Sequence, residues 1–190
     1  MKKIVVLSFF LGILALVTLS SLSIGADSPI KQTSIVTLSA ERVLRLETVI
    51  NASRDEVWKA FATEAGLRGW LAPLVRLDWR VGGSMKTNYD SAANIDGAGT
   101  ITNTIVNYLP GELITYKVNL TATFAPSVRA EDKNLQHIVQ LVPLGKHETK
   151  LISSMVGWGA GADWDKAYDF FAKGNAWEFG KLRTYLESTK

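Results

Sequence analysis

Histidine is the side chain best suited to acid–base chemistry near neutral pH, and the chain has two histidines. His137 lies in a β-like segment, where it could face a cavity and act as a general base together with Tyr116 or Asp78. The alternative, which we favour, is a histidine that faces solvent or forms an ordinary hydrogen bond in a strand. His147 lies in a Gly-Lys-His-Glu turn, where we expect it to be exposed. His137 is therefore the one catalytic candidate, and the sequence favours a protein that is not an enzyme.

Other chemical motifs are incomplete. The chain has no cysteine, and two distant histidines lack the spacing of metal ligands, so we expect no metal site. No serine stands in the Gly-x-Ser-x-Gly context of a nucleophile elbow. The glycine-rich residues 157–161 lack the Lys-Ser/Thr end of a phosphate-binding loop and the order of a dinucleotide fingerprint. We expect this segment to turn the chain from the last strand into the last helix, and we expect no cofactor.

The charge distribution argues against a nucleic-acid partner. The chain carries a net charge of +3, and Lys2 and Lys3 account for two of these charges. No run of Lys or Arg is longer than two residues, and no expected helix has a basic face. We therefore expect no nucleic acid among the partners.

The first residues have the pattern of a secretory signal peptide. Lys2 and Lys3 precede an apolar run over residues 4–17, and Ser23 and Gly25 place small side chains at a cleavage site after residue 25. Cleavage one residue later and retention as an anchor are the alternatives, but the run is shorter than the roughly 20 apolar residues that a spanning helix needs. A lipoprotein is excluded because no cysteine can carry the lipid. We expect a periplasmic or secreted protein that meets the membrane only through this segment before cleavage.

The chain behind the signal peptide is expected to form one domain. An irregular leader over residues 26–41, loose or lying along the surface, precedes a domain over residues 42–190. Alternation, β-branched residues and turn signals predict a series of strands in this domain, interrupted by a charged loop over residues 125–134. The expected strands span residues 43–50, 74–81, 84–90, 99–108, 113–124, 136–142 and 149–156.

Two short helices and one long helix complete the pattern. Ser53 and Glu56 form a capping-box signature, which predicts a helix that Gly66 ends. A short helical turn over residues 67–71 follows. The last helix is expected from about residue 162 to residue 187. A curved antiparallel sheet needs a cover on its concave face, and this long helix is the only candidate of sufficient size, so a tapering space that binds small apolar molecules is expected between them.

Several short segments, taken in order, resemble one protein superfamily. The segment Val49-Ile50-Asn51-Ala52-Ser53-Arg54-Asp55-Glu56-Val57-Trp58 resembles the opening strand and helix of the START-related helix-grip superfamily, which includes the birch-pollen allergen and polyketide cyclases. Further segments are similar to the branch called activator-of-heat-shock-protein-ATPase-like, and the resemblance covers residues 43–188. They are Leu67-Arg68-Gly69-Trp70, Asp78-Trp79-Arg80-Val81-Gly82-Gly83, Leu109-Pro110-Gly111-Glu112-Leu113, and Trp177 with Leu182.

The resemblance implies an α+β helix-grip fold. A curved antiparallel sheet would wrap around a long C-terminal helix, with two short helices after the first strand and a cavity between sheet and helix. The cytosolic chaperone partner in the name of the branch is not carried over, because an exported protein would not meet it. Cyclase and hydrolase relatives place acid and base residues in the cavity, and we find no equivalent constellation in this sequence.

We therefore predict an exported protein that binds a small hydrophobic or amphipathic molecule, or a lipid, in this cavity. Five aromatic residues are candidates to contact the ligand, namely Tyr89, Tyr116, Phe124, Trp158 and Phe171. In a helix-grip fold Trp158 and Trp164 would lie near the cavity entrance, although we favour the alternative that they fill the end of the core. An enzyme of cyclase or hydrolase type is one alternative function. A protein-interaction module that uses an apolar sheet face or residues 125–134 is another.

Overall fold

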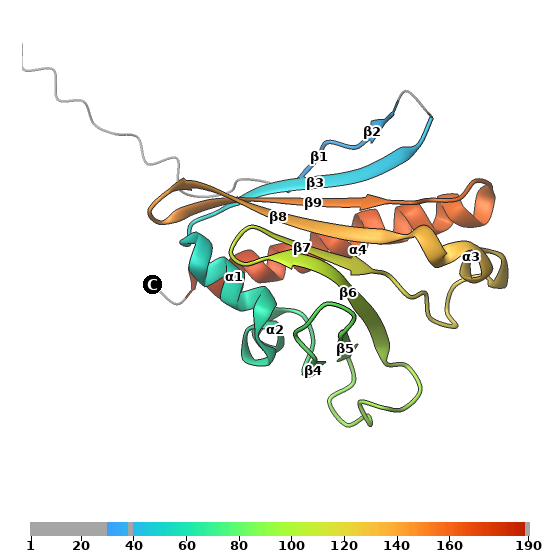
Figure 1. Ribbon diagram of the computed structural model, residues 1–190, viewed down its shortest axis with the longest axis horizontal. Coiled ribbons are helices and arrows are strands. Elements are labelled where there is room, and N and C mark those ends of the chain that lie inside the picture. Colours follow the sequence, from blue (N-terminus) through green and yellow to red (C-terminus); the bar gives the residue numbers. More distant parts are fainter. Residues whose placement is uncertain (1–29, 38–39, 189–190) are drawn as a thin grey trace, which may run out of the picture.

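The computed structural model describes residues 30–37 and 40–188 of the chain (Figure 1). The expected signal peptide and its cleavage site lie outside the described residues. None of the described helices combines the length and the apolar character needed to cross a bilayer. The strands are β1 (Lys31–Gln32), β2 (Ile35–Val36), β3 (Arg42–Ile50), β4 (Leu74–Leu77), β5 (Ser84–Asn88), β6 (Ile101–Leu109), β7 (Leu113–Lys117), β8 (Gln136–Gly145) and β9 (Glu148–Val156). The helices are α1 (Arg54–Ala62), α2 (Glu64–Trp70), α3 (Pro126–Glu131), a 3-10 turn (Asp132–Asn134) and α4 (Ala162–Glu187).

The strands form one antiparallel sheet, and α4 lies along one face of it (Figure 1). The strand order is β1-β3-β9-β8-β7-β6-β5-β4, with β2 also paired to β3. The first long strand therefore pairs with the last, while the middle strands follow one another as a meander. This arrangement confirms the predicted α+β helix-grip fold, including the two short helices after the first long strand.

The leader lies along the domain surface, which is one of the two arrangements that the sequence predicted. The sequence did not predict the two short strands in this leader, β1 and β2, which pair with β3 in the registers Lys31↔Glu47 and Ile35↔Val43. The backbone N–H of Thr33 also donates to the carbonyl of Arg45 at 2.8 Å. The leader thus covers the outer edge of β3 and satisfies backbone groups that an edge strand would otherwise expose.

Several predicted strands are shorter than expected, and the segments 74–81 and 113–124 differ most. β4 ends at Leu77, because residues 78–83 fold back in a turn where the N–H of Gly83 donates to the carbonyl of Arg80. β7 ends at Lys117, after which the chain leaves the ladder of paired strands and the side-chain amide of Asn119 donates to the carbonyl of Thr102. The predictions for both segments were too long because residues with high strand propensity continue past the points where the backbone pairing stops.

The expected charged loop over residues 125–134 is largely helical. Pro126 occupies the first turn of α3, a position where its missing N–H costs nothing. Val128 is buried on the inner side of this helix. The predicted interaction loop is therefore a short helix anchored to the core by one apolar side chain.

The start of α1 follows the prediction, and its end does not. Ser53 accepts from the N–H of Glu56, whose carboxylate accepts from the N–H of Ser53, which completes the capping box. The helix ends at Ala62 and not at Gly66, because Thr63 has an extended backbone and its Oγ1 caps α2 by accepting from the N–H of Gly66. Gly66 instead allows close packing, since a Cβ there would lie 2.3 Å from the carbonyl oxygen of Lys59.

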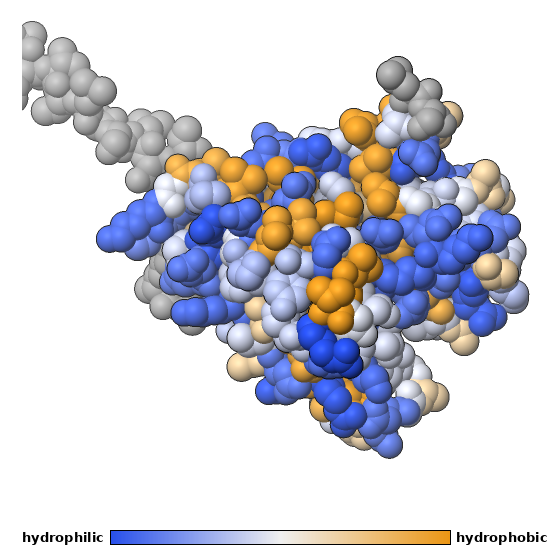
Figure 2. Space-filling view, viewed as in Figure 1, coloured by the Kyte–Doolittle hydropathy of each residue, from blue (hydrophilic) through white to orange (hydrophobic). Residues whose placement is uncertain are grey.

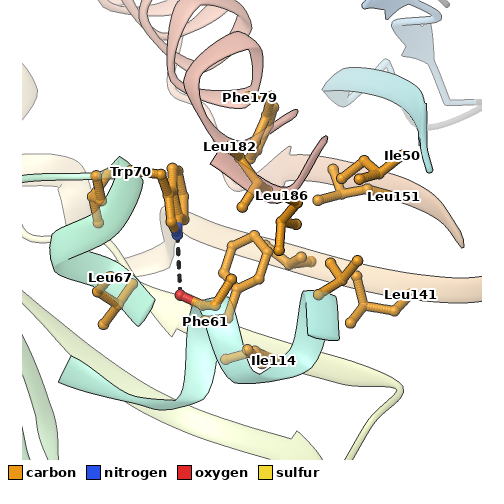
Figure 3. Close-up of a cluster of buried hydrophobic side chains, with 14 of the residues drawn as sticks. Ile50, Phe61, Leu67, Trp70, Ile114, Leu141, Leu151, Phe179, Leu182 and Leu186 are labelled. Carbon is orange, nitrogen blue, oxygen red and sulfur yellow. Dashed lines mark hydrogen bonds between the residues drawn. The ribbon is translucent and has the colours of Figure 1, made fainter. Parts of the chain in front are cut away.

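The buried side chains form two clusters, at opposite ends of α4. The larger cluster joins α1, α2 and the sheet to Phe179, Leu182 and Leu186 of α4 (Figure 3). Within it, the indole Nε1 of Trp70 donates to the carbonyl of Ala60 at 3.0 Å, which satisfies one of the unpaired carbonyls at the end of α1. The smaller cluster gathers Leu44, Met155 and Trp164 around the first turns of α4.

Apolar side chains also occur on the outer surface (Figure 2). The exposed ones on strands include Ile35, Val36, Leu109, Val142 and Leu144. Figure 2 shows hydrophobic residues gathered in a band over the middle of this face, with hydrophilic residues around and among them. Because a contiguous apolar patch of several hundred Å² is typical of an interaction surface, the interaction module stays a prediction for this face.

Candidate ligand-binding cavity

A cavity of about 990 Å³ lies between the sheet and the middle of α4. Its wall is built by α1 and α2, by strands β5 to β9, by the loops before β6 and after β7, and by α4. Most of the lining side chains are apolar, including Phe61, Leu67, Trp70, Met85, Val139 and Phe179. A volume of this size suits a small organic ligand.

A row of three side chains crosses the sheet at the cavity wall. Tyr116 on β7 is paired with His137 on β8, and His137 is paired with Met155 on β9. Residues directly opposite on antiparallel strands project from the same face. All three line the cavity. Sheet register therefore places a phenol, an imidazole and a thioether next to one another.

Tyr116 is the most deeply buried polar side chain of this row. It is 3% exposed, and its hydroxyl oxygen is buried without a hydrogen-bond partner among the described residues. A buried hydroxyl without a partner costs about 1–3 kcal/mol. Burial also raises the pKa of the phenol, so the group keeps its proton and remains a hydrogen-bond donor.

His137 faces the cavity rather than the outer surface. Its Nε2 lies 2.8 Å from Ser153 Oγ, and its ring centroid lies 6.3 Å from that of Phe179 on α4. Burial lowers the pKa of the imidazole to about 4, because the charged form is poorly solvated there. The ring is therefore neutral at neutral pH, with one nitrogen that donates and one that accepts. The structure thus combines a cavity position with an ordinary hydrogen bond, and His147 is exposed in the turn after β8.

Asn175 supplies a third polar group from the opposite wall. This side chain on α4 is 8% exposed and lines the cavity. Its amide nitrogen donates to the sulfur of Met155 at 3.3 Å. Sulfur is a weak acceptor, so the amide keeps hydrogen-bonding capacity for a polar ligand atom.

A polar cluster stands where β5 approaches α4. The hydroxyl of Tyr89 donates to Glu178 Oε1, and Lys181 Nζ lies 4.0 Å from the ring centroid of Trp177. The pKa of Glu178 is raised, because burial raises it by more than the hydrogen bond from Tyr89 and the charge of Lys181 lower it. Tyr89, Trp177 and Glu178 line the cavity, and both aromatic residues are substantially exposed. These side chains therefore mark the place where the cavity meets solvent.

Phenylalanine rings form the wall between the loop after β7 and α4. Phe124 stacks on Phe171, with ring centroids 5.5 Å apart and planes 9° from parallel. Phe170 meets Phe124 edge to face at 5.2 Å and is itself exposed. All three line the cavity.

Of the five predicted contact residues, the structure brings four to the cavity, namely Tyr89, Tyr116, Phe124 and Phe171. Trp158 is placed elsewhere. Its ring packs against Trp164 and Tyr168, and its Nε1 donates to the carbonyl of Met155 at 2.9 Å. Trp164 is 2% exposed, so these two rings fill the end of the smaller cluster. Trp158 lies within the turn of residues 157–161, and its ring packs against the smaller cluster, as the favoured alternative for Trp158 and Trp164 predicted.

Asp78 does not belong to the cavity either. Its carboxylate pairs with Arg80 at 3.0 Å on an exposed turn after β4. It is therefore too exposed to act with His137 as an acid–base pair, and a surface ion pair of this kind contributes little to stability.

Sequence reasoning missed the contribution of α4 to the polar lining. Phe171, Asn175, Phe179, Leu182 and Leu186 follow one another at spacings of three or four residues, which defines the inner stripe of the helix. Asn175 is the polar exception in that stripe, and this interruption was the available signal for a cavity-facing group.

Comparisons with known proteins agree with this architecture. A family model described as "Activator of Hsp90 ATPase homolog 1-like protein" matches residues 51–187. This match confirms the resemblance drawn from the short segments above. A search of curated proteins found no match.

Solved structures share the fold at low sequence identity. Protein MLL2253 from Mesorhizobium loti is 22% identical, with a TM-score of 0.61, and the match covers 78% of this chain and 99% of that one. The Aha1 dimer from Colwellia psychrerythraea is 17% identical, with a TM-score of 0.60 and coverage of 78% and 98%. CalU16 from Micromonospora echinospora is 13% identical, with a TM-score of 0.60 and coverage of 85% and 86%. At these identities the likeness concerns the fold alone.

Proposed function

We propose that this chain, which belongs to the family described as Activator of Hsp90 ATPase homolog 1-like protein, binds a small hydrophobic or amphipathic molecule between its sheet and α4. The observation that carries the proposal is a cavity of about 990 Å³ whose wall is mainly apolar and includes a few polar side chains. This composition is typical of small-molecule sites, where apolar contacts supply affinity and a few polar groups fix orientation.

The expected affinity follows from the area that a ligand would bury. Apolar surface removed from water contributes about 25 cal/mol per Å² before the cost of association. A ligand that buries about 400 Å² would gain about 10 kcal/mol on this scale, and the lost freedom of association would consume several kcal/mol. Micromolar binding therefore needs no charged anchor in the cavity.

Export is part of the same proposal. The positive residues, apolar run and small residues of positions 2–25 support a cleaved signal peptide. Fractionation of the cells that make the protein, followed by intact-mass measurement, tests this point. A mature chain that begins near residue 26 and lies outside the cytoplasm is the expected result, and a full-length cytoplasmic chain would contradict it.

Blocking the cavity tests the binding function. Gly174 lies on the cavity side of α4, and a Cβ built on it meets no atom within 4 Å. The substitution Gly174→Leu should place a leucine in the cavity and reduce binding of the neutral dye Nile red by more than about tenfold. The substitution should not destabilise α4, because leucine is a better helix former than glycine by up to about 1 kcal/mol.

Gly180→Leu is the matched control. Gly180 also lies in α4 with open space around its Cβ, but it does not line the cavity. The control should bind Nile red as the unaltered protein does. Equal binding by both variants and the unaltered protein, with the fold intact by circular dichroism, would place the dye elsewhere and contradict the proposal. Native mass spectrometry of protein purified from its own cells should then show a released small molecule, which the Gly174→Leu variant lacks.

One observation favours an enzyme as the second candidate, namely that His137 lines the cavity. A pKa of about 4 makes its imidazole a weak base at neutral pH, and an efficient general base has a pKa near the working pH. Binding without chemistry therefore ranks first. Turnover of p-nitrophenyl decanoate by the unaltered protein, with loss of turnover in His137→Gln, would reverse this order.

A further inference from the structure

The cavity contains polar groups but hardly any charge. Among the described residues, Glu178 is the only carboxylate that lines the cavity, no Lys or Arg lines it, and His137 is neutral at neutral pH. Its carboxylate accepts a hydrogen bond from Tyr89, beside Lys181 at the surface. A bound carboxylate or phosphate group would therefore find no cation inside the cavity, and ionised Glu178 would repel it. This lining selects against anions.

Three polar side chains of the wall lie close together, and other polar side chains, among them Thr87, Asn103 and Asn119, also line the cavity. Tyr116, His137 and Asn175 come from β7, β8 and α4, and Met155 links them, because it is paired with His137 across the strands and contacts the amide of Asn175. The Tyr116 and His137 ring centroids are 6.4 Å apart. We call these three residues the inner polar cluster.

The hydroxyl of Tyr116 is the unsatisfied member of this cluster. His137 has a partner in Ser153 and Asn175 has one in Met155, whereas Tyr116 Oη has none among the described residues. A buried donor without an acceptor is unfavourable, and an incoming oxygen atom that accepts from it relieves that cost. A ligand that supplies the acceptor therefore gains more than one that is apolar throughout.

From these observations, and on the basis of the binding function proposed above, we infer that the ligand is a neutral amphiphile with one carbonyl or hydroxyl oxygen at its buried end. This oxygen accepts a hydrogen bond from Tyr116 within the inner polar cluster. The apolar body of the molecule lies against the rings of Phe124, Phe171 and Phe179. Fatty acids, phospholipid head groups and other anions are thereby disfavoured at the buried end.

Three probes of similar length separate the possibilities. 2-Decanone offers a neutral acceptor, 1-chlorodecane is a poor acceptor, and decanoate is an anion. Each is used to displace Nile red from the unaltered protein, from Tyr116→Phe and from Tyr108→Phe. Tyr108 is the control because it is half-buried against Trp79 and does not line the cavity.

The Tyr116→Phe substitution should weaken the binding of 2-decanone by about five- to tenfold and leave the binding of 1-chlorodecane unchanged, because only the ketone loses a hydrogen bond. The same substitution should leave the melting temperature of the ligand-free protein unchanged or higher, since it removes an unsatisfied buried group. A tyrosine with a purely structural role would give the opposite sign in this second measurement. Tyr108→Phe should not alter the affinity for either probe.

Two results would overturn the inference while leaving the binding function intact. One is an equal effect of Tyr116→Phe on 2-decanone and 1-chlorodecane, and the other is tighter binding of decanoate than of 2-decanone to the unaltered protein. If no probe displaces the dye and Gly174→Leu does not alter dye binding, the cavity is not a binding site and both proposals fail.

Discussion

Tyr116 and His137 lie directly opposite each other on β7 and β8, and both line the cavity under α4. The tyrosine carries a hydroxyl without a partner, whereas the histidine is neutral and hydrogen-bonded to Ser153. This pair contributes polar groups to the cavity without contributing charge.

His137 should make the protein sensitive to acid. Its pKa is about 6.5 when unfolded and about 4 when folded, so folding favours the neutral ring. The resulting stability is fully present above pH 6.5 and is lost as the pH falls through the interval from 6.5 to 4. One pKa unit corresponds to about 1.4 kcal/mol, so the loss amounts to about 3 kcal/mol over this interval.

The substitution His137→Gln should remove this dependence. Urea unfolding at several pH values between 7.5 and 4.5 measures it as the difference in unfolding free energy between the variant and the unaltered protein. At pH 7.5 the variant should have the lower unfolding free energy, because it loses the contact with Ser153. Toward pH 4.5 this difference from the unaltered protein should become smaller. His147→Gln serves as the control and should leave the profile unaltered, because His147 is exposed. Parallel profiles for all three proteins would show that burial of His137 does not control acid stability.

The turn before α4 should depend on Gly157. Its φ is +83°, and a Cβ at this position would lie 2.0 Å from the carbonyl oxygen of Asn134. Gly157→Ala should therefore destabilise the protein by about 4 kcal/mol, through backbone strain and a clash with rigid main chain. The urea midpoint measures this loss.

Gly161→Ala is a control that introduces backbone strain without a steric clash. Gly161 also has a positive φ, +99°, but a Cβ there meets no atom within 4 Å. This variant should lose only about 1–2 kcal/mol from strain. Similar losses in the two variants would mean that the approach to Asn134 does not limit the turn.

Trp70 should be more important for stability than its place in a short helix suggests. Its indole donates to the carbonyl of Ala60 and packs edge to face on Phe61 at 5.1 Å (Figure 3). Trp70→Phe removes the hydrogen bond, leaves a buried carbonyl without its donor and creates a small void, which should cost about 2–3 kcal/mol. Trp177→Phe, at a 60% exposed position, should change stability by less than about 0.5 kcal/mol. Thermal unfolding of both variants distinguishes the two sites, and equal losses would contradict the assigned role of Trp70.

Features that depend on neighbouring residues could be predicted from the sequence. The capping box of Ser53 and Glu56, the span of α4 and the turn role of residues 157–161 all follow from short-range patterns. The order of elements, together with the family resemblance, also gave the fold. By contrast, the pairing of residues 31–36 with β3 and the helix at Pro126 were missed, because tertiary contacts override weak local propensities.

The cavity itself was decided by tertiary structure. The alternation of residues in β8 did not decide from which face of the sheet His137 projects. The pairing of β7, β8 and β9 places it on the face that lies under α4. Trp158 and Phe171 are both aromatic residues near the same turn, yet one fills the core and the other lines the cavity. The sequence by itself determined most of the elements and a cysteine-free core rich in aromatic residues, because local backbone and burial preferences depend on neighbouring residues. The polarity, charge and open volume of the site were decided only in three dimensions, because they depend on side chains from distant segments that sheet register and helix packing bring together.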